Sequence, residues 1–284
     1  QPSPYASLPR MVMMTYKVPD EIIDVARGGE FNSFDLNAFF EAKGEGANAE
    51  FVMKEHVQKW LDLMRGSYLP KAHDDLKLGK AKPALPYSDT RLLNVLNHTV
   101  WYLPRVNSCY AMRNLLAEKQ NVFYHNYKIN VAAGEACVGL AALERVQETM
   151  EDPLESKTIT LTCGKLTTGV TVKPWTGIFM LTNMRSPETY FQAAFRVQSP
   201  WTVKTEGGKE EIIKKECYVF DFALDRSLRM VSDYSCRLST RNVSPEQKVG
   251  EFIDFLPVLA YDGSAMKQVS ASEILDIAMA GTSA

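Results

Sequence analysis

Between about Thr90 and Leu224 the chain alternates short, almost wholly apolar runs with stretches of helical pattern. The apolar runs predict strands at His98–Leu103, Val122–Ile129, Thr158–Cys163, Gly177–Thr182 and Cys217–Leu224. The stretches between them predict helices from Asn107 or Ser108 to about Lys119, over Gly134–Met150, and from Ser186 onward. Strands that are apolar on both faces and alternate with helices are typical of a parallel sheet covered on two sides. The sequence therefore predicts an α/β fold with a central parallel sheet and helices on both faces.

Two less regular segments flank this section. Residues 1–89 contain a predicted strand at Arg10–Tyr16, predicted helices at Phe34–Phe40 and Ala49–Met64, and a linker with three prolines and two glycines after residue 65. Residues 226–284 show a helical pattern, because Ser244 and Ser270 each begin a capping box. An apolar helix face follows the first of these boxes, made of Phe252, Phe255, Leu256 and Leu259. We therefore expect an N-terminal extension with a linker (1–89), a lobe (90–225) and a helical C-terminal extension (226–284).

The composition is that of an ordinary globular protein. The chain has 284 residues, of which 45% are hydrophobic and 23% are charged, and its net charge of −2 gives no overall basic field. A nucleic-acid contact would therefore need a local basic patch. The five cysteines form no CxxC pair and the four histidines no HxxxH pair, so neither a disulfide framework nor a metal site is predicted.

The sequence also indicates the cellular compartment of the protein. No run approaches the about 20 apolar residues that a membrane-spanning helix needs, and the first residues do not resemble a signal peptide. Together with the cysteine usage, this predicts a cytoplasmic protein with no membrane partner. The chain starts with Gln1 rather than methionine, which leads us to expect a processed chain or part of a longer one.

Two short runs carry most of the functional signal. LTCGKLTTGVTV (Leu161–Val172) is an apolar strand that leads into a loop rich in glycine and threonine. YFQAAFRVQSPW (Tyr190–Trp201) follows Ser186 and Pro187, which start a helix, and places Gln192 and Arg196 four residues apart on one helix face. Amides, hydroxyl groups and a guanidinium near one sheet edge suit a polyphosphate ligand.

These two runs resemble the fifth and sixth motifs of superfamily 2 helicases and translocases, especially the motors of restriction enzymes. The resemblance covers about residues 95–201 and implies that the lobe is RecA-like and is the C-terminal motor lobe of such an enzyme. It implies that Arg196 is the arginine finger and that Gln192 assists it, as the catalytic pair. It also implies nucleotide contacts from Gly169, Thr171, Gln192 and Arg196, and DNA contacts from Thr167 and Thr168.

The run HTVWYLPRVNSCYAMRNLL (His98–Leu116) resembles the fourth motif of the same family, in which a helix start faces the DNA backbone. The resemblance implies that Arg105, Asn107 and Ser108 contact DNA phosphates, and backbone amides at a helix start favour an anion. Three positions depart from the family pattern: Phe195 replaces a glycine, Ser199 replaces a second arginine, and Thr171 replaces an acidic residue.

Purely structural interpretations of the same residues, without a ligand, stay open. The Gly/Thr loop can be an ordinary strand-to-helix connection, Arg196 a surface arginine, and Asn107 and Ser108 plain helix caps.

The sequence also lacks the parts that would hold ATP. It contains no GxxxxGK[ST] motif, since Leu166 follows Lys165, and no acidic box follows an apolar strand. In the family, ATP and Mg2+ are bound mainly by a first RecA-like lobe, which we expect in the same parent polypeptide. A nuclease or methyltransferase domain is a further candidate partner. The isolated chain is therefore predicted to be inactive. A non-catalytic interaction module and a complete small nucleotide-dependent α/β transferase are the alternatives.

Overall fold

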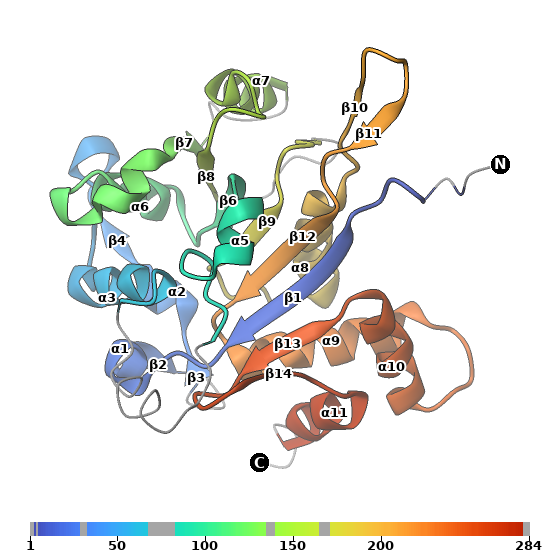
Figure 1. The fold of residues 1–284 in the computed structure, drawn as a ribbon. Coiled ribbons are helices and arrows are strands. Elements are labelled where there is room, and N and C mark those ends of the chain that lie inside the picture. The colour runs from blue at the N-terminus through green and yellow to red at the C-terminus, as the bar shows by residue number, and fades with distance from the viewer. Residues whose placement is uncertain are drawn as a thin grey trace.

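The computed structural model describes residues 3, 5–28, 33–67, 83–134, 140–164 and 171–280. Within this part of the chain a central eight-stranded sheet has the order β14-β13-β1-β12-β9-β6-β8-β7 (Figure 1). Every neighbouring pair in it is parallel except β13 and β14. The strands are β1 (Arg10–Tyr16), β6 (His98–Tyr102), β7 (Lys128–Ala132), β8 (Thr158–Thr162), β9 (Gly177–Met180), β12 (Glu216–Asp221), β13 (Val258–Tyr261) and β14 (Met266–Gln268). The predicted α/β class with a mainly parallel sheet is confirmed.

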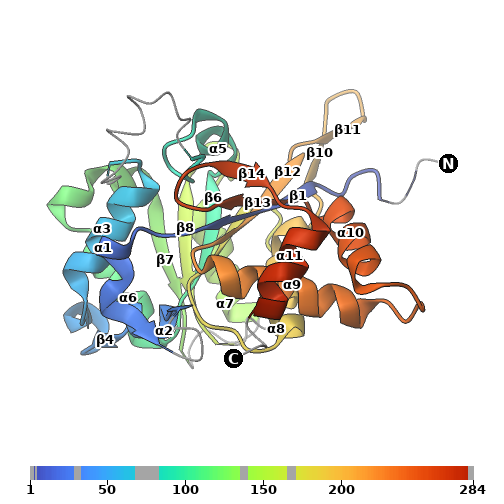
Figure 2. The same cartoon turned by 90° about the horizontal axis from the view of Figure 1, so that it is seen from below.

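Helices cover both faces of this sheet (Figure 2). The α-helices are α1 (Asp20–Ile23), α2 (Leu36–Phe39), α3 (Lys54–Met64), α5 (Thr90–Val95), α6 (Val106–Leu116), α7 (Leu140–Met150), α8 (Pro187–Ala194), α9 (Leu224–Leu238), α10 (Pro245–Phe255) and α11 (Ala271–Ala280). Short 3-10 helices span Asp24–Ala26, Gly46–Asn48, Lys119–Asn126 and Phe195–Gln198. Three two-stranded ribbons pair β2 (Arg27–Gly28) with β3 (Ser33–Phe34), β4 (Ala42–Lys43) with β5 (Glu50–Phe51), and β10 (Thr202–Lys204) with β11 (Glu210–Ile212).

The alternation of side chains along each strand divides the core into two layers. Trp101 and Phe179 point to the layer formed with α2, α3 and α6, where Trp60 is also fully buried. Val100 and Ile178 point to the opposite layer, under α7 to α11. Because both layers are apolar, strands such as β6 and β9 are buried along their whole length, as the sequence pattern predicted.

The sheet draws strands from all three predicted segments. β1, from residues 1–89, lies in the interior of the sheet between β12 and β13. The segment 226–284, for which only helices were predicted, contributes β13 and β14 besides α9 to α11. Whether any segment folds by itself stays a prediction.

The largest differences from the predicted elements lie at two places, besides Leu259, which was predicted on a helix face and lies in β13 because α10 ends at Phe255. Residues predicted as the strand Val122–Ile129 form a 3-10 helix, Lys119–Asn126, and the strand β7 begins only at Lys128. The predicted helix Ala49–Met64 begins at Lys54, after the short strand β5. The helix predicted over Gly134–Met150 is described as α7 from Leu140 onward, and residues 135–139 lie outside the described residues.

The membrane prediction can be examined only within the described ranges. None of the helices found there is long and apolar enough to cross a bilayer.

Candidate functional site

Parallel pairing brings the predicted functional segments to one edge of the sheet, which we call the carboxyl edge. It consists of the last residues of β6, β8, β9 and β12 and of the residues that follow each strand. Tyr102, the last residue of β6, is in register with Thr162 of β8 and Met180 of β9. The three strands that carry or precede the family-like motifs therefore end side by side.

The helix that carries Gln192 begins as the sequence predicts. Ser186 is its N-cap, with its hydroxyl oxygen 3.3 Å from the amide of Thr189, and Pro187 occupies the first turn. α8 ends at Ala194, and the chain continues as the tighter 3-10 helix Phe195–Gln198, which carries Arg196. Gln192 is exposed and Arg196 is half-buried.

Arg196 lies close to the sheet. Burial lowers the pKa of its guanidinium, and the nearby Tyr102 opposes this effect electrostatically. Since Tyr102 is the last residue of β6, Arg196, from the run that resembles the sixth motif, lies near the strand of the run that resembles the fourth motif. An arginine stays charged under such a shift, so Arg196 is a half-buried cation on the face of the sheet that α8 covers. The helical run that carries it starts at the carboxyl edge, and its last residue, Gln198, donates to the carbonyl oxygen of Pro9, just before β1, over 3.3 Å.

The Gly/Thr loop is described only in part. The residues Lys165, Thr167, Thr168 and Gly169 lie outside the described residues. Thr171, at the end of the loop, is exposed.

At the start of the helix after β6, two of the three side chains that were predicted to contact DNA form hydrogen bonds within the protein. Ser108 is fully buried and its hydroxyl donates a hydrogen bond of 2.8 Å to the carbonyl oxygen of Phe40. The Asn107 amide donates one of 2.9 Å to the carbonyl oxygen of Ala42. Both side chains therefore tie α6 to residues 40–42, which corrects the predicted DNA contact of Ser108. The side-chain oxygen of Asn107 is buried and has no hydrogen-bond partner among the described residues. Arg105, the N-cap residue of α6, is exposed.

A polar network, absent from the sequence prediction, lines the same edge beyond β9. The Asn183 amide donates to the Asp35 carboxylate over 2.8 Å, and the Thr182 hydroxyl donates to the Asn37 side-chain oxygen over 2.8 Å. Arg226 of α9 contacts Asn183 and donates to the carbonyl oxygen of Phe34 over 2.9 Å. The partners are 43 to 192 residues apart in sequence, so no local pattern could have indicated these contacts.

Asp221, at the end of β12, is the buried acid of this edge. The Tyr190 hydroxyl of α8 donates to Asp221 Oδ2 over 2.7 Å, and the amide of Ala223 donates to Oδ1 over 2.7 Å. Burial raises the pKa of Asp221 to about 6, while these two donors and the nearby Arg226 oppose the rise. The only sequence signal for this group is an acidic residue at the end of an apolar strand.

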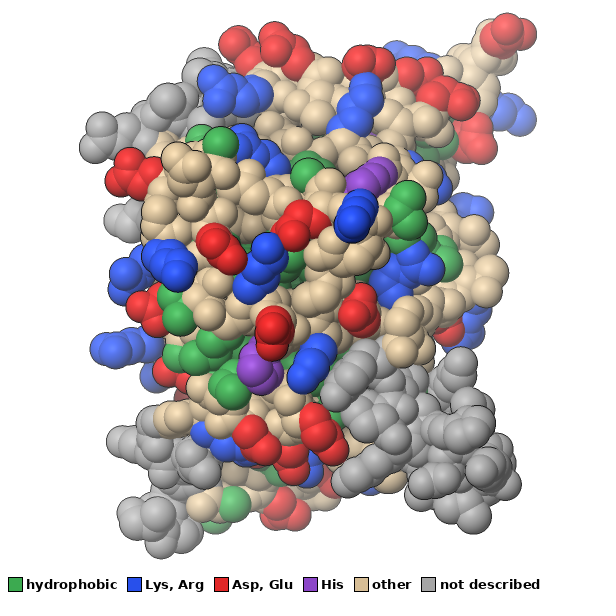
Figure 3. Space-filling view, turned by 90° about the vertical axis from the view of Figure 1, so that its left-hand side faces the viewer, with side chains coloured by type: hydrophobic (Ala, Val, Ile, Leu, Met, Phe, Trp, Pro, Cys, Tyr) green, Lys and Arg blue, Asp and Glu red, His purple; other side chains and the backbone are tan. Residues whose placement is uncertain are grey.

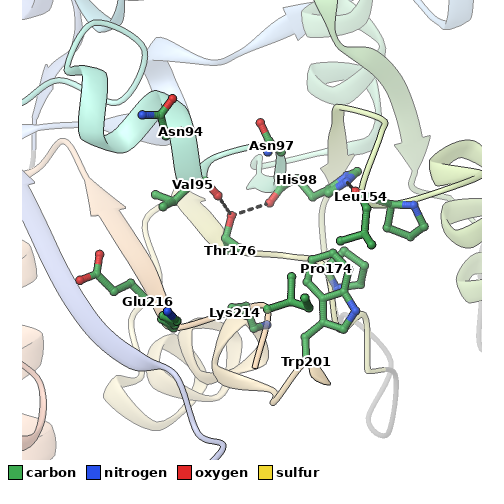
Figure 4. A pocket seen from close by; sticks show the side chains of 13 residues that line it. Asn94, Val95, Asn97, His98, Leu154, Pro174, Thr176, Trp201, Lys214 and Glu216 are labelled. Atoms are coloured by element: carbon green, nitrogen blue, oxygen red, sulfur yellow. Dashed lines mark hydrogen bonds between the residues drawn. The ribbon is translucent and has the colours of Figure 1, made fainter. Parts of the chain in front are cut away.

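A cavity of about 380 Å³ lies at the opposite, amino edge of the sheet (Figure 4). Lys214, almost fully buried, lines it and donates from Nζ to the carbonyl oxygens of Lys173 and Trp175, each over 2.8 Å, and to Ser199 Oγ over 3.3 Å. Burial lowers the pKa of Lys214 to about 8. Two of its contacts thus hold the segment before β9, and the third holds Ser199, which follows the 3-10 helix Phe195–Gln198.

His98 at the same cavity is also engaged. Its Nε2 donates to the carbonyl oxygen of Pro153 over 2.7 Å, so Nδ1 accepts from the Thr158 hydroxyl over 2.8 Å. Burial lowers the pKa of His98, which favours this neutral form. The cavity therefore offers no free acid–base pair from these two side chains.

Within the described ranges, no group of three or more His, Cys, Asp or Glu side chains is arranged to hold a metal ion. The face shown in Figure 3 carries acidic and basic side chains interspersed, with no large patch of one sign. Any contact with a polyanion on this face would have to be local, in line with the near-neutral composition.

The fold and the side chains at the carboxyl edge together define an α/β protein with cationic and polar side chains at the carboxyl ends of its parallel strands. No protein-family model matches the chain. It is similar to a protein of Mycoplasma pneumoniae (strain ATCC 29342 / M129 / Subtype 1) named "Putative type II restriction enzyme and methyltransferase RM.MpnORF110P C-terminus". The two are 29% identical over 176 residues, which cover 60% of this chain and 24% of that protein. The chain thus matches about a quarter of the relative's length.

Proposed function

We propose that the chain is the second motor lobe of an ATP-dependent DNA helicase or translocase that belongs to a restriction-modification enzyme. The observation that carries the proposal is the convergence at the carboxyl edge. The strands of three family-like motifs end side by side there, and Arg196 lies near Tyr102 of the first. The name of the Mycoplasma pneumoniae relative supports the restriction-modification context.

In this proposal the chain supplies one wall of the ATP site. Arg196 stabilises the negative charge that develops on the transferred phosphoryl group, and Gln192, one helical turn before it, helps to orient the guanidinium or the nucleotide. Thr171 and the loop before it contact the nucleotide, and Arg105 contacts the DNA backbone. Phosphate contacts of this kind position a motor without reading sequence.

ATP and Mg2+ fit this chain only as ligands shared with another lobe. The sequence has no phosphate-cradling GxxxxGK[ST] loop, and the described residues include no acidic cluster for Mg2+. When a first lobe binds MgATP, the nucleotide supplies the phosphoryl group that is transferred to water. The isolated 284-residue chain is accordingly proposed to lack ATPase activity, and robust hydrolysis by the purified chain would contradict the proposal.

The decisive experiment measures DNA-stimulated ATPase of the polypeptide that contains this chain, wild type against Arg196→Ala. We expect kcat to fall by about 10³-fold or more while ATP binding is retained, because the group stabilises the transition state rather than the bound nucleotide.

Arg91→Ala is the matched control for this experiment. Arg91 is an exposed arginine on α5, which precedes β6 and therefore lies away from the carboxyl edge, and its removal should leave kcat unchanged. An Arg196→Ala enzyme with wild-type kcat would remove Arg196 from the chemistry and favour a non-catalytic interaction module.

A further inference from the structure

A buried, directed hydrogen bond joins the helical run that carries the proposed arginine finger to the sheet. Tyr190 precedes Gln192 by two residues and Arg196 by six on the continuous helical run of α8 and the 3-10 helix after it. Its hydroxyl donates to Asp221 Oδ2 over 2.7 Å. Tyr190 is 3% exposed and Asp221 is 4% exposed, so water does not compete for this bond.

The acceptor end of this bond is fixed. Asp221 is paired within the sheet on both sides, with Thr15 of β1 and Met180 of β9 in register. Its second carboxylate oxygen accepts the amide of Ala223 over 2.7 Å. Asp221 is therefore a rigid reference point at the carboxyl edge.

The other polar contacts described for this helical run lie near its two ends, where Glu188 pairs with Arg237 of α9 over 3.1 Å and Gln198 donates to the carbonyl oxygen of Pro9 over 3.3 Å. Between them its contacts are mainly apolar. Phe191 stacks on Tyr234 with ring centroids 4.5 Å apart and meets Phe252 edge to face at 5.4 Å. Such apolar contacts hold the helix against α9 and α10 but have little directionality. A hydrogen bond between two buried groups does have direction, so it can fix where the next turns of the helix place their side chains.

We propose that Tyr190 and Asp221 are positioning residues that set the place of Gln192 and Arg196 relative to the sheet. The proposal rests on the proposed function, because positioning matters for catalysis only if Arg196 acts on a phosphoryl group. A misplacement of about 1 Å is enough to cost about 100-fold in rate when a group acts on a transition state.

The first test uses Tyr190→Phe, which deletes only the hydroxyl. In the polypeptide that contains this chain, we expect kcat of the DNA-stimulated ATPase to fall about tenfold or more, while KM for ATP stays within about twofold. Asp221→Asn should lower kcat as well. The double variant should be no slower than the slower single variant, since both changes break the same hydrogen bond.

Tyr218→Phe is the matched control. The Tyr218 hydroxyl donates to the Glu216 carboxylate at the other end of the same strand β12, and it does not touch α8. Its removal deletes a partly buried tyrosine–carboxylate bond of the same strand, so an effect of losing any tyrosine hydroxyl from β12 or its neighbours would appear in both tyrosine variants. We expect wild-type kcat for Tyr218→Phe.

A second measurement separates this inference from the proposed function. Amide hydrogen exchange of the 284-residue chain reports the opening of α8 and of the 3-10 helix after it without any need for ATPase activity. We expect exchange over residues 187–198 to accelerate about tenfold in Tyr190→Phe but not in Tyr218→Phe.

The outcomes are distinguishable. Wild-type kcat in Arg196→Ala overturns the proposed function, whatever Tyr190 does. Unchanged exchange in Tyr190→Phe, or wild-type kcat in Tyr190→Phe when Arg196→Ala is inactive, overturns the positioning role of Tyr190 and Asp221.

Discussion

Three threonines of β8 point to the same face of the sheet, yet their hydroxyl groups have different surroundings. Thr158 is hydrogen-bonded to His98 over 2.8 Å, and Thr162 donates to the carbonyl oxygen of Ala132 over 2.8 Å. The hydroxyl of Thr160, which is 1% exposed, has no hydrogen-bond partner in the described part of the chain. Because a buried hydroxyl without a partner costs free energy, the middle threonine should contribute least to stability.

This difference predicts opposite results for two nearly isosteric substitutions. Thr160→Val should leave the free energy of unfolding unchanged or raise it by up to about 1 kcal/mol, because no hydrogen bond is lost. Thr162→Val should lower it by about 1 kcal/mol, because the Ala132 carbonyl loses its donor. Chemical denaturation of both variants checks the prediction, and a larger loss for Thr160→Val than for Thr162→Val would contradict it.

The lowered pKa of Lys214 predicts that the stability of the folded protein depends on pH. Its pKa is about 8 in the folded protein against 10.5 for a free lysine, so between pH 8 and 10.5 the unfolded chain binds more protons than the folded one. The contribution of this group to the free energy of unfolding is therefore lowest below pH 8 and rises with pH through this window, by about 3 kcal/mol.

The measurement for Lys214 is the difference between two proteins. Denaturation of the wild type and of Lys214→Met at pH 7.5 and at pH 10 cancels the titration of all other groups. The gain in stability should be larger in the wild type, and an equal change in both proteins would exclude Lys214 as its source.

Among the elements, those whose packing follows from their own sequence could be predicted. β6, β8 and β9 were found from their apolar runs, because each is buried on both faces. The start of α8 was found from Ser186 and Pro187, since both the cap and the first-turn proline act locally.

The prediction of a strand at Val122–Ile129 was wrong, because contacts with residues distant in sequence determine the conformation of this segment. Tyr87, about 36 residues earlier, packs against Phe123, Tyr124 and Tyr127 with ring centroids 5.6 to 5.9 Å apart. These contacts hold the aromatic side chains on a turn of 3-10 helix, although their residue types favour a strand. β propensity was thus overridden by packing from another part of the chain.

The prediction of the candidate site was limited in the same way. The sequence indicated which strand ends carry polar residues, and the parallel sheet places those ends side by side as expected. It could not indicate that Ser108 would bond to Phe40, a residue 68 positions earlier, nor that Tyr190 would bond to Asp221. Partners of this kind become visible only when the three-dimensional neighbours are known.

At the scale of the whole molecule, the position of β1 joins the ends of the chain to its middle. β1 pairs with β12 on one side and with β13 on the other, so strands from residues 1–89, 90–225 and 226–284 share one hydrogen-bonded sheet. The helix α3 from the first segment also buries Trp60 against Trp101 of β6, with ring centroids 5.9 Å apart. The middle segment therefore depends on both flanks for its core.

This dependence predicts that a fragment of residues 90–225 does not fold cooperatively by itself. Without β1, strand β12 becomes an exposed edge, and its buried residues Cys217 and Val219 lose the methionines of β1 that are their register neighbours, Met11 and Met13. Trp101 loses Trp60 on the opposite layer. Exposed apolar faces and an unpaired edge of this kind favour aggregation over a single folded state. Circular dichroism during heating tests this: the 284-residue chain should unfold in one cooperative transition and the fragment should show none, whereas a cooperative transition in the fragment would establish residues 90–225 as an independent domain.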